Sequence, residues 1–595
     1  MNISDRQKRD LISQWAFDTR PILGRMHLWL EDVEVDWLRG KPVPEFTGDI
    51  AFLDGRMERL MAMTVAVTAL GTRLFGRFGE GRNKDKAELN RVKKDADAIS
   101  AYAMSESLWY ASRQLPENHA ILVCLGEGLM PKVGETKEMG SNPQLGFGRV
   151  YARPQVAKWL DARVTRLLND DDDGWEEFWG EINESGITVW GAAIDTLENT
   201  SRFAKGENTG PLTVLHLFNQ PLHITRPYEG YMGNLFLPMA VVRKAEEKSV
   251  LLDFMTPRKK VVEAIEDAYP GIKRQNIHVW TLGGRSRTRR LGWLWNQWRE
   301  TDVHLVEAGW KLPTGIEAFN DSGTYAPTYL VGSWLDTSGI PHVFLVDGYA
   351  ASAEAMQAVS LAPMLDLDGT LVTLTSRFDL PIEKERFVMR MDPAAGDFKE
   401  SLEKLCGHPL DDAEVSLYEE MIREAREAGM PSASRVIRAD DFFPEKNWDV
   451  VALSGYMCDD PYSDAPGVEE LTEGRFRVTA RFATPRADKR ITFTLRLMEE
   501  TGQQRLVFNP LLTRFFYGED YKSRAVKISD SGRIRNELQT LCSEALEHRS
   551  DGIIRVHFDR IPPEVISGRD QEVLRDVLTW YKRHHPLWFD WLELA

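Results

Sequence analysis

Between about residues 211 and 365, short apolar segments alternate with segments of helical periodicity. "LTVLHLF", "IHVWTL" and "HVFLV" are almost entirely apolar, whereas "TPRKKVVEAIEDAY" repeats apolar residues at helical spacing. A strand that is apolar on both faces is buried on both faces, which is typical of a parallel sheet covered by helices. The sequence therefore predicts an α/β domain over residues 116–365, with a mostly parallel sheet and a variable insertion at 129–210.

The flanking regions show different patterns. Apolar residues recur at helical spacing through the first 115 residues, including "PILGRMHLWLEDVEVDWL" at 21–38, so we expect a helical region at 1–115. Beyond that domain, segments such as "GRFRVTARFATP" alternate polar and apolar residues, as half-buried antiparallel strands do. We expect residues 366–595 to form an α+β domain with antiparallel strands. The chain as a whole is expected to belong to the α/β class.

Composition and charge restrict the possible partners. The chain has 595 residues, which predicts two or three domains, and a formal net charge of -17, which argues against nucleic acid as a partner. Its four cysteines show no CxxC spacing, and this fits a reducing cytoplasm. The start shows no signal-peptide pattern, and the longest apolar stretch, 60–70, is too short to cross a bilayer. We therefore expect a cytoplasmic chain with no membrane partner.

Four strand-like segments begin with histidine and end at glycine: "HAILVCLGEG", "HVWTLGG", "HLVEAG" and "HVFLVDG". The recurrence suggests a metal site formed by His119, His278, His304 and His342. Parallel α/β sheets, however, bind ligands at the carboxyl ends of their strands, and these histidines mark the amino ends. We expect them to cap or pack the far edge of the sheet.

The carboxyl ends carry the residues that suit an anion. "GGRSRTRR" follows one strand and opens a helix, and it joins flexible glycines, a helix N-terminus and guanidinium groups, the combination that suits phosphate. A second hydroxyl-rich helix start occurs at "NDSGTY". The alternative is that the arginines pair with surface carboxylates of an acidic protein. The predicted phosphate-binding residues are Gly283, Gly284, Arg285, Ser286, Arg287, Ser322 and Thr324.

Tryptophans follow in the same predicted helix. Leu291, Leu294, Trp295 and Trp298 recur at i, i+3, i+4 and i+7, which indicates packing against the core and not stacking on a ligand.

Glu307 and Asp347 are acids at the ends of two predicted strands that are neighbours or near neighbours. Carboxylates in such a position can hold Mg²⁺ together with a substrate phosphate, or move protons. We expect them to be metal ligands and catalytic groups; the alternative is that they cap helices or pair with the arginines.

A further acidic motif, "MLDLDGTLV", resembles the first motif of haloacid dehalogenase-like phosphatases. The resemblance implies that Asp366 is a nucleophile, that Asp368 is a general acid/base and that Mg²⁺ bridges them. "VVALSG", ending at Ser454 and Gly455, resembles the second motif of that family. The resemblance covers only short windows, and the antiparallel pattern after Ser454 differs from the βα units of that fold. Alternatively, "LAPML" is a further strand of the sheet, and it brings both aspartates to the same carboxyl edge as metal ligands.

Three functions remain open at this point. The first is a Mg²⁺-dependent enzyme acting on a phosphorylated small molecule such as a sugar phosphate. The second is a non-catalytic sensor of a phosphorylated metabolite or nucleotide. The third is a homo-oligomeric structural or assembly protein whose arginines form interface salt bridges.

Overall fold

The computed structural model describes most of the chain. The described residues are 27–39, 55–126, 145–223, 231–351, 357, 369–375, 388–498 and 535–595, apart from gaps within these ranges that include 170–173, 282–287, 319–327, 428–433 and 563–570.

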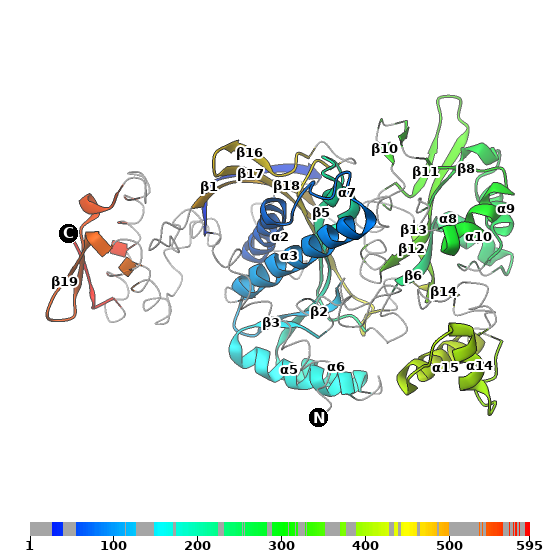
Figure 1. Ribbon diagram of the computed structural model, residues 1–595, viewed down its shortest axis with the longest axis horizontal. Coiled ribbons are helices and arrows are strands. Elements are labelled where there is room, and N and C mark those ends of the chain that lie inside the picture. Colours follow the sequence, from blue (N-terminus) through cyan, green and yellow to red (C-terminus); the bar gives the residue numbers. More distant parts are fainter. Residues whose placement is uncertain are drawn as a thin grey trace.

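A nine-stranded sheet forms one half of the structure, in the order β1-β18-β17-β15-β5-β4-β2-β3, with β16 paired to β17. Its helices include α2 and α3, which Figure 1 shows lying across the sheet. The strands are β1 (His27–Arg39), β2 (His119–Gly126), β3 (Val150–Ala152), β4 (Thr188–Glu198), β5 (Leu212–Phe218), β15 (Val450–Tyr456), β16 (Glu469–Thr472), β17 (Arg475–Ala483) and β18 (Asp488–Met498). The helices are α2 (Gly55–Phe75), α3 (Lys86–Ser112), α5 (Pro154–Asn169), α6 (Trp175–Ser185) and α7 (Thr200–Lys205).

A seven-stranded sheet forms the other half, in the order β14-β13-β6-β12-β7-β8, with β11 paired to β12. Figure 1 shows α8, α9 and α10 together on one side of it. The strands are β6 (Tyr231–Pro238), β7 (Ile277–Trp280), β8 (His304–Leu305), β11 (Gly332–Leu335), β12 (Pro341–Ala351), β13 (Gly369–Thr375) and β14 (Ser434–Ile437). The helices are α8 (Met239–Glu247), α9 (Arg258–Ala268), α10 (Thr288–Arg299), α14 (Phe398–Cys406) and α15 (Asp412–Glu427).

Two small sheets complete the described structure. Strands β9 (Trp310–Lys311) and β10 (Glu317–Ala318) form a hairpin, and β19 (Leu546–His548), β20 (Ile554–Val556) and β21 (Leu592–Leu594) form a three-stranded sheet. Short 3-10 turns lie at Arg274–Asn276, Ser543–Ala545 and Phe558–Arg560.

Both large sheets are mixed, and this corrects the expectation of a mostly parallel central sheet. Within them, β2 is parallel to β4, and β7 is parallel to both β8 and β12. The neighbouring pairs β4–β5 and β6–β12 are antiparallel. The error has a physical cause: a strand in the middle of a mixed sheet is also buried on both faces, so an apolar sequence does not reveal its direction. The α/β class itself is consistent with the structure.

Residues 27–39 form a strand, where the sequence analysis expected a helix. Val33, Val35 and Trp37 alternate with charged residues, which is the period of a strand, and the apolar cluster at 28–30 hid this alternation. Strand β1 pairs antiparallel with β18. Glu31 accepts a hydrogen bond from the guanidinium group of Arg475 and forms an ion pair with Arg496. The N-terminal region is therefore not wholly helical.

Strands pair across both of the domain boundaries that the sequence suggested, at 115/116 and at 365/366. Strand β1 pairs with β18, β5 pairs with β15, and β6 pairs with β13. The early and late parts of the chain thus share sheets.

Helices α2 and α3 cover one face of the nine-stranded sheet and form a core with residues such as Leu215 and Leu453. The apolar stretch 60–70 lies within α2 and is mostly buried, as predicted. Lys489 of β18 donates to Glu58 of α2, and both side chains are nearly buried. In the part of the chain that the structure describes, no helix has the length and apolarity needed to cross a bilayer.

Candidate functional site

Strand β7 lies at the centre of the candidate site, between β8 and β12 and parallel to both. From β7 the chain continues through residues 282–287 and α10 to β8, which pairs with one edge of β7. Strand β12 pairs with the other edge of β7. In open α/β sheets, ligands bind at the carboxyl ends of parallel strands. The residues between β7 and α10 follow the carboxyl end of β7 in the sequence.

Most of the residues predicted for this site lie outside the described residues. They are Gly283, Gly284, Arg285, Ser286, Arg287, Ser322, Thr324, Asp366 and Asp368. The described part of the site therefore consists of α10, the strands around it, Glu307 and Asp347.

Helix α10 packs against the sheet as its sequence predicts. Leu294 and Trp298 are fully buried in the core, and Trp295 packs against that core. The helix begins at Thr288, directly after residues 283–287 in the sequence, so the unpaired N–H groups of its first turn follow that segment.

Asp347 is fully buried in β12 and accepts hydrogen bonds from two side chains. Arg258, at the start of α9, donates through Nε at 2.7 Å and through Nη2 at 3.1 Å. Trp298 of α10 donates through Nε1 at 2.6 Å. Burial raises the pKa of Asp347, and the Arg258 guanidinium opposes that rise. In this arrangement Asp347 holds α9 and α10 against the sheet.

Arg258 is fixed from several directions. Its Nη1 donates to the carbonyl oxygen of Thr256 at 2.5 Å, and its backbone N–H donates to Gln297 of α10 at 3.0 Å. The sequence analysis missed Arg258, because a basic residue at the start of an amphipathic helix is ordinarily exposed. Its fully buried position follows from the tertiary fold and has no local sequence signal.

Glu307 is exposed just after β8, and β7 separates its strand from that of Asp347. The carboxylate of Glu307 raises the pKa of His304, whereas burial of that imidazole lowers it more strongly. Among the described residues, no group of three or more His, Cys, Asp or Glu is placed to hold a metal ion. A magnesium site that also uses Asp366 and Asp368 stays a prediction.

Three of the four strand-initial histidines meet in the seven-stranded sheet. His278 contacts His304 at 2.7 Å between their Nδ1 atoms, and its Nε2 lies 2.9 Å from Nδ1 of His342. His119 belongs instead to the nine-stranded sheet, where its Nδ1 accepts a hydrogen bond from Trp190 at 3.2 Å. The three clustered histidines lie near the amino ends of β7, β8 and β12.

The two phosphatase-like windows lie in different sheets. Strand β13 begins at Gly369, directly after Asp368, and belongs to the seven-stranded sheet. Ser454 and Gly455 are buried in β15 of the nine-stranded sheet. The strands after them, β16 to β18, are antiparallel, as the sequence predicts. This topology does not match the βα units that the resemblance requires.

Asn234 is a second residue that the sequence analysis did not use. It is fully buried in β6, opposite Gly348 of β12 and Thr373 of β13, and neither of its side-chain polar atoms has a hydrogen-bond partner. Its only sequence signal is an amide within the apolar strand "YMGNLFLP".

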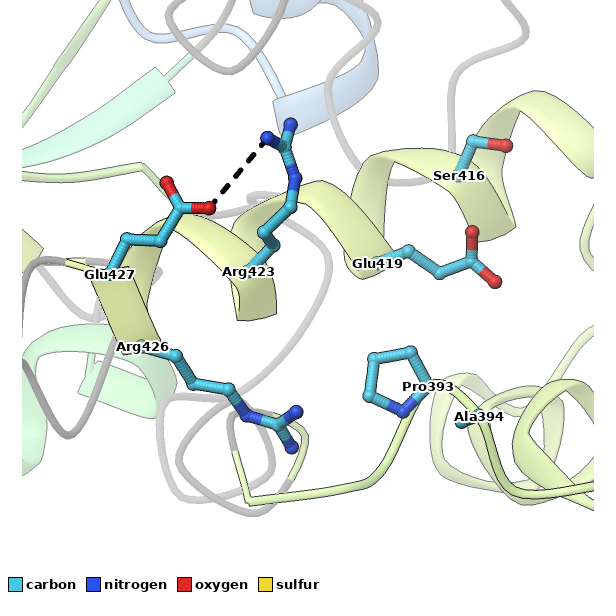
Figure 2. Close-up of a pocket in the computed structure, with 7 residues that line it drawn as sticks. All are labelled: Pro393, Ala394, Ser416, Glu419, Arg423, Arg426 and Glu427. Carbon is cyan, nitrogen blue, oxygen red and sulfur yellow. Dashed lines mark ion pairs between the residues drawn. The ribbon is translucent and has the colours of Figure 1, made fainter.

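A surface hollow of about 620 Å³ lies along α15, apart from these residues. Figure 2 shows Arg423 reaching toward Glu427, 3.9 Å away, while Arg426 and Glu419 lie on the side that faces Pro393. Arg426 donates to the carbonyl oxygen of Met391 at 2.7 Å. Two arginines and two glutamates line the hollow, and their charges balance, so the hollow does not select an anion.

The comparisons with known proteins found no match: no family model matches the chain, and no curated protein sequence matches it significantly.

Proposed function

We propose that the chain binds a phosphorylated small molecule in the loop between β7 and α10. The observation that carries this proposal is the topology around β7, with β8 and β12 parallel on its two sides and the chain leaving toward β8 through α10. A phosphate in that loop would meet the helix N-terminus, Arg285, Ser286 and Arg287. Ser322 and Thr324 are proposed to contribute hydroxyl groups.

We further propose that the protein is a Mg²⁺-dependent enzyme acting on that molecule, in a reducing cytoplasm. Glu307, Asp366 and Asp368 would supply oxygen ligands for Mg²⁺, which neutralises phosphate charge when bound. Asp347 would contribute by holding α9 and α10 in place, because its oxygens already accept hydrogen bonds from Arg258 and Trp298.

The engagement of Asp347 favours a second candidate function, a non-catalytic sensor of the same class of molecule. A carboxylate that is buried and paired with Arg258 is not available to move protons. The sensor would use the same loop without turnover.

A thermal-shift screen of phosphorylated metabolites, with and without Mg²⁺, tests the proposal. A ligand at one hundred times its dissociation constant stabilises a protein by roughly 2.7 kcal/mol, which such a screen detects. Product analysis of each hit then separates enzyme from sensor. If no phosphorylated compound raises the melting temperature and the chain elutes as a large homo-oligomer, the scaffold function replaces both.

A further inference from the structure

Four side chains form a continuous polar chain near the amino ends of β7, β8 and β12. His304 and His278 are 2.7 Å apart between their Nδ1 atoms, and His278 Nε2 lies 2.9 Å from His342 Nδ1. His342 Nε2 then faces Oδ2 of Asp336 at 3.7 Å. His304 is half-buried, and its Nε2 has no hydrogen-bond partner in the described structure.

Aromatic side chains fix the orientation of these imidazoles. Trp334 stacks on His278 with ring centres 5.5 Å apart and 7° between the planes, and it also stacks on His342 at 5.4 Å. Trp310 of β9 packs against His278 at 4.7 Å and against His304 at 5.2 Å. The rings therefore cannot rotate freely away from one another.

Asp336 is held as an ionised acceptor by its own turn. Its Oδ1 accepts hydrogen bonds from the backbone N–H groups of Ser338 at 2.8 Å and Ile340 at 2.9 Å. These bonds lower the pKa of Asp336, the one from Ile340 most strongly. Its Oδ2 is directed toward His342.

The hydrogen bonds assign the tautomers. Burial lowers the pKa of His278 to about 3, so this ring is neutral near pH 7 and carries one N–H and one bare nitrogen. A bare nitrogen of His342 facing the Asp336 carboxylate would be repelled, so His342 carries its proton on Nε2 and accepts at Nδ1. His278 therefore donates through Nε2, and its Nδ1 accepts from Nδ1–H of His304. This set of tautomers leaves Nε2 of His304 without a proton and able to accept one.

We propose that His304, His278, His342 and Asp336 form a proton relay whose accepting end, His304 Nε2, acts as a general base toward water or a hydroxyl group. A proton that reaches Nε2 of His304 releases the Nδ1 proton of that ring to His278. His278 in turn passes its Nε2 proton to His342. The result is an imidazolium at His342 beside the Asp336 carboxylate, with every hydrogen bond of the chain still formed.

The remaining charges around the cluster are few among the described residues of β7, β8, β9, β11 and β12. Burial lowers the pKa of His304, and the carboxylate of Glu307, after β8, opposes this lowering in part. Lys311 of β9 is exposed, and Asp347, further along β12, is paired with Arg258. The relay lies at the amino ends of β7, β8 and β12, whereas the proposed phosphate-binding residues 283–287 follow the carboxyl end of β7.

Hydrolysis of p-nitrophenyl acetate tests the relay with a probe that carries no phosphate. The base takes a proton from water as its oxygen attacks the carbonyl carbon, the bond to p-nitrophenolate breaks, and the relay returns its proton to solvent. We expect His304→Gln to reduce the protein-dependent rate about a hundredfold, within the range typical of general-base catalysis. His408→Gln, an exposed histidine after α14, is the matched control and should leave the rate unchanged.

Asp336→Asn tests the positioning role of the carboxylate at the other end of the relay. Without the carboxylate, an imidazolium at His342 is less favourable, so the rate should fall about tenfold or more and its pH profile should move to lower pH. Equal rates for wild type and His304→Gln, or an unchanged pH profile in Asp336→Asn with the fold intact by circular dichroism, would overturn the relay. Selective ¹⁵N-histidine NMR gives an independent check: finding His304 protonated at Nε2 and bare at Nδ1 would also reject it.

Discussion

At the scale of single residues, the buried ion pair between Arg258 and Asp347 is the contact on which the candidate site depends. Both side chains are completely buried, and the pair connects α9 to β12 while Trp298 connects α10 to the same carboxylate. Removing one member of such a pair leaves an uncompensated buried charge, whereas replacing both with apolar groups removes the desolvation cost as well.

Asp347→Asn or Arg258→Ala alone should therefore lower the free energy of unfolding by about 3–5 kcal/mol. The double substitution Arg258→Met with Asp347→Leu should recover most of that loss. Urea denaturation of the three variants measures the effect. Single substitutions that cost less than about 1 kcal/mol would show that the pair is not buried as described.

His216 provides a pH-dependent test at the same scale. It is fully buried in β5, and burial lowers its pKa from 6.5 to about 3. The folded protein thus favours the neutral ring, so this stabilisation is complete above about pH 6.5 and is lost as the pH falls toward 3. His216→Phe should lose less stability between pH 7 and pH 5 than wild type does, in thermal melts at each pH. An equal loss of melting temperature between pH 7 and pH 5 in the two proteins would contradict this.

At the scale of elements, the sequence predicted best what local pattern controls. In helices α2, α10 and α15, apolar residues recur at the spacing of the buried face. Strands β5, β15 and β17 have the apolar or alternating sequences expected of strands. The segments "SVLLDFM" at 249–255 and "RFVMRM" at 386–391 are as apolar as those strands, yet the described residues within them do not form strands. Whether such a segment forms a strand depends on the strands available to pair with it, and the sequence of the segment alone does not show this.

Two glycines test how closely the elements pack. A Cβ at Gly455 of β15 would lie 2.2 Å from the carbonyl oxygen of Val65 in α2, whereas a Cβ at Gly180 of α6 would meet nothing within 4 Å. Gly455→Ala should destabilise the protein by about 1–3 kcal/mol. Gly180→Ala, the matched control, should stabilise it by up to about 1 kcal/mol, because alanine favours helix. Equal melting temperatures for the two variants would mean that α2 does not rest directly on β15.

At the scale of the whole molecule, the sequence could not predict the sheet partners. Strand β1 at residues 27–39 pairs with β18 at 488–498, and no local signal joins segments so far apart. For the same reason the candidate site was only partly predictable. The strand–loop–helix order around β7 and the tryptophans of α10 follow from sequence, whereas the partner of Asp347 and the meeting of His278, His304 and His342 depend on tertiary packing.

Phosphate binding between β7 and α10 is tested most directly by calorimetric titration with a phosphorylated compound from the thermal screen. Wild type should bind, Arg287→Ala should lose at least about tenfold in affinity through the missing charge-assisted hydrogen bonds, and affinity should weaken with added salt. Arg290→Ala, at the third position of α10, is the matched control. Helical periodicity predicts that Arg290 lies further round the helix than Arg287, so this variant should bind as wild type does. Equal affinities for wild type and Arg287→Ala would contradict the assignment of this loop.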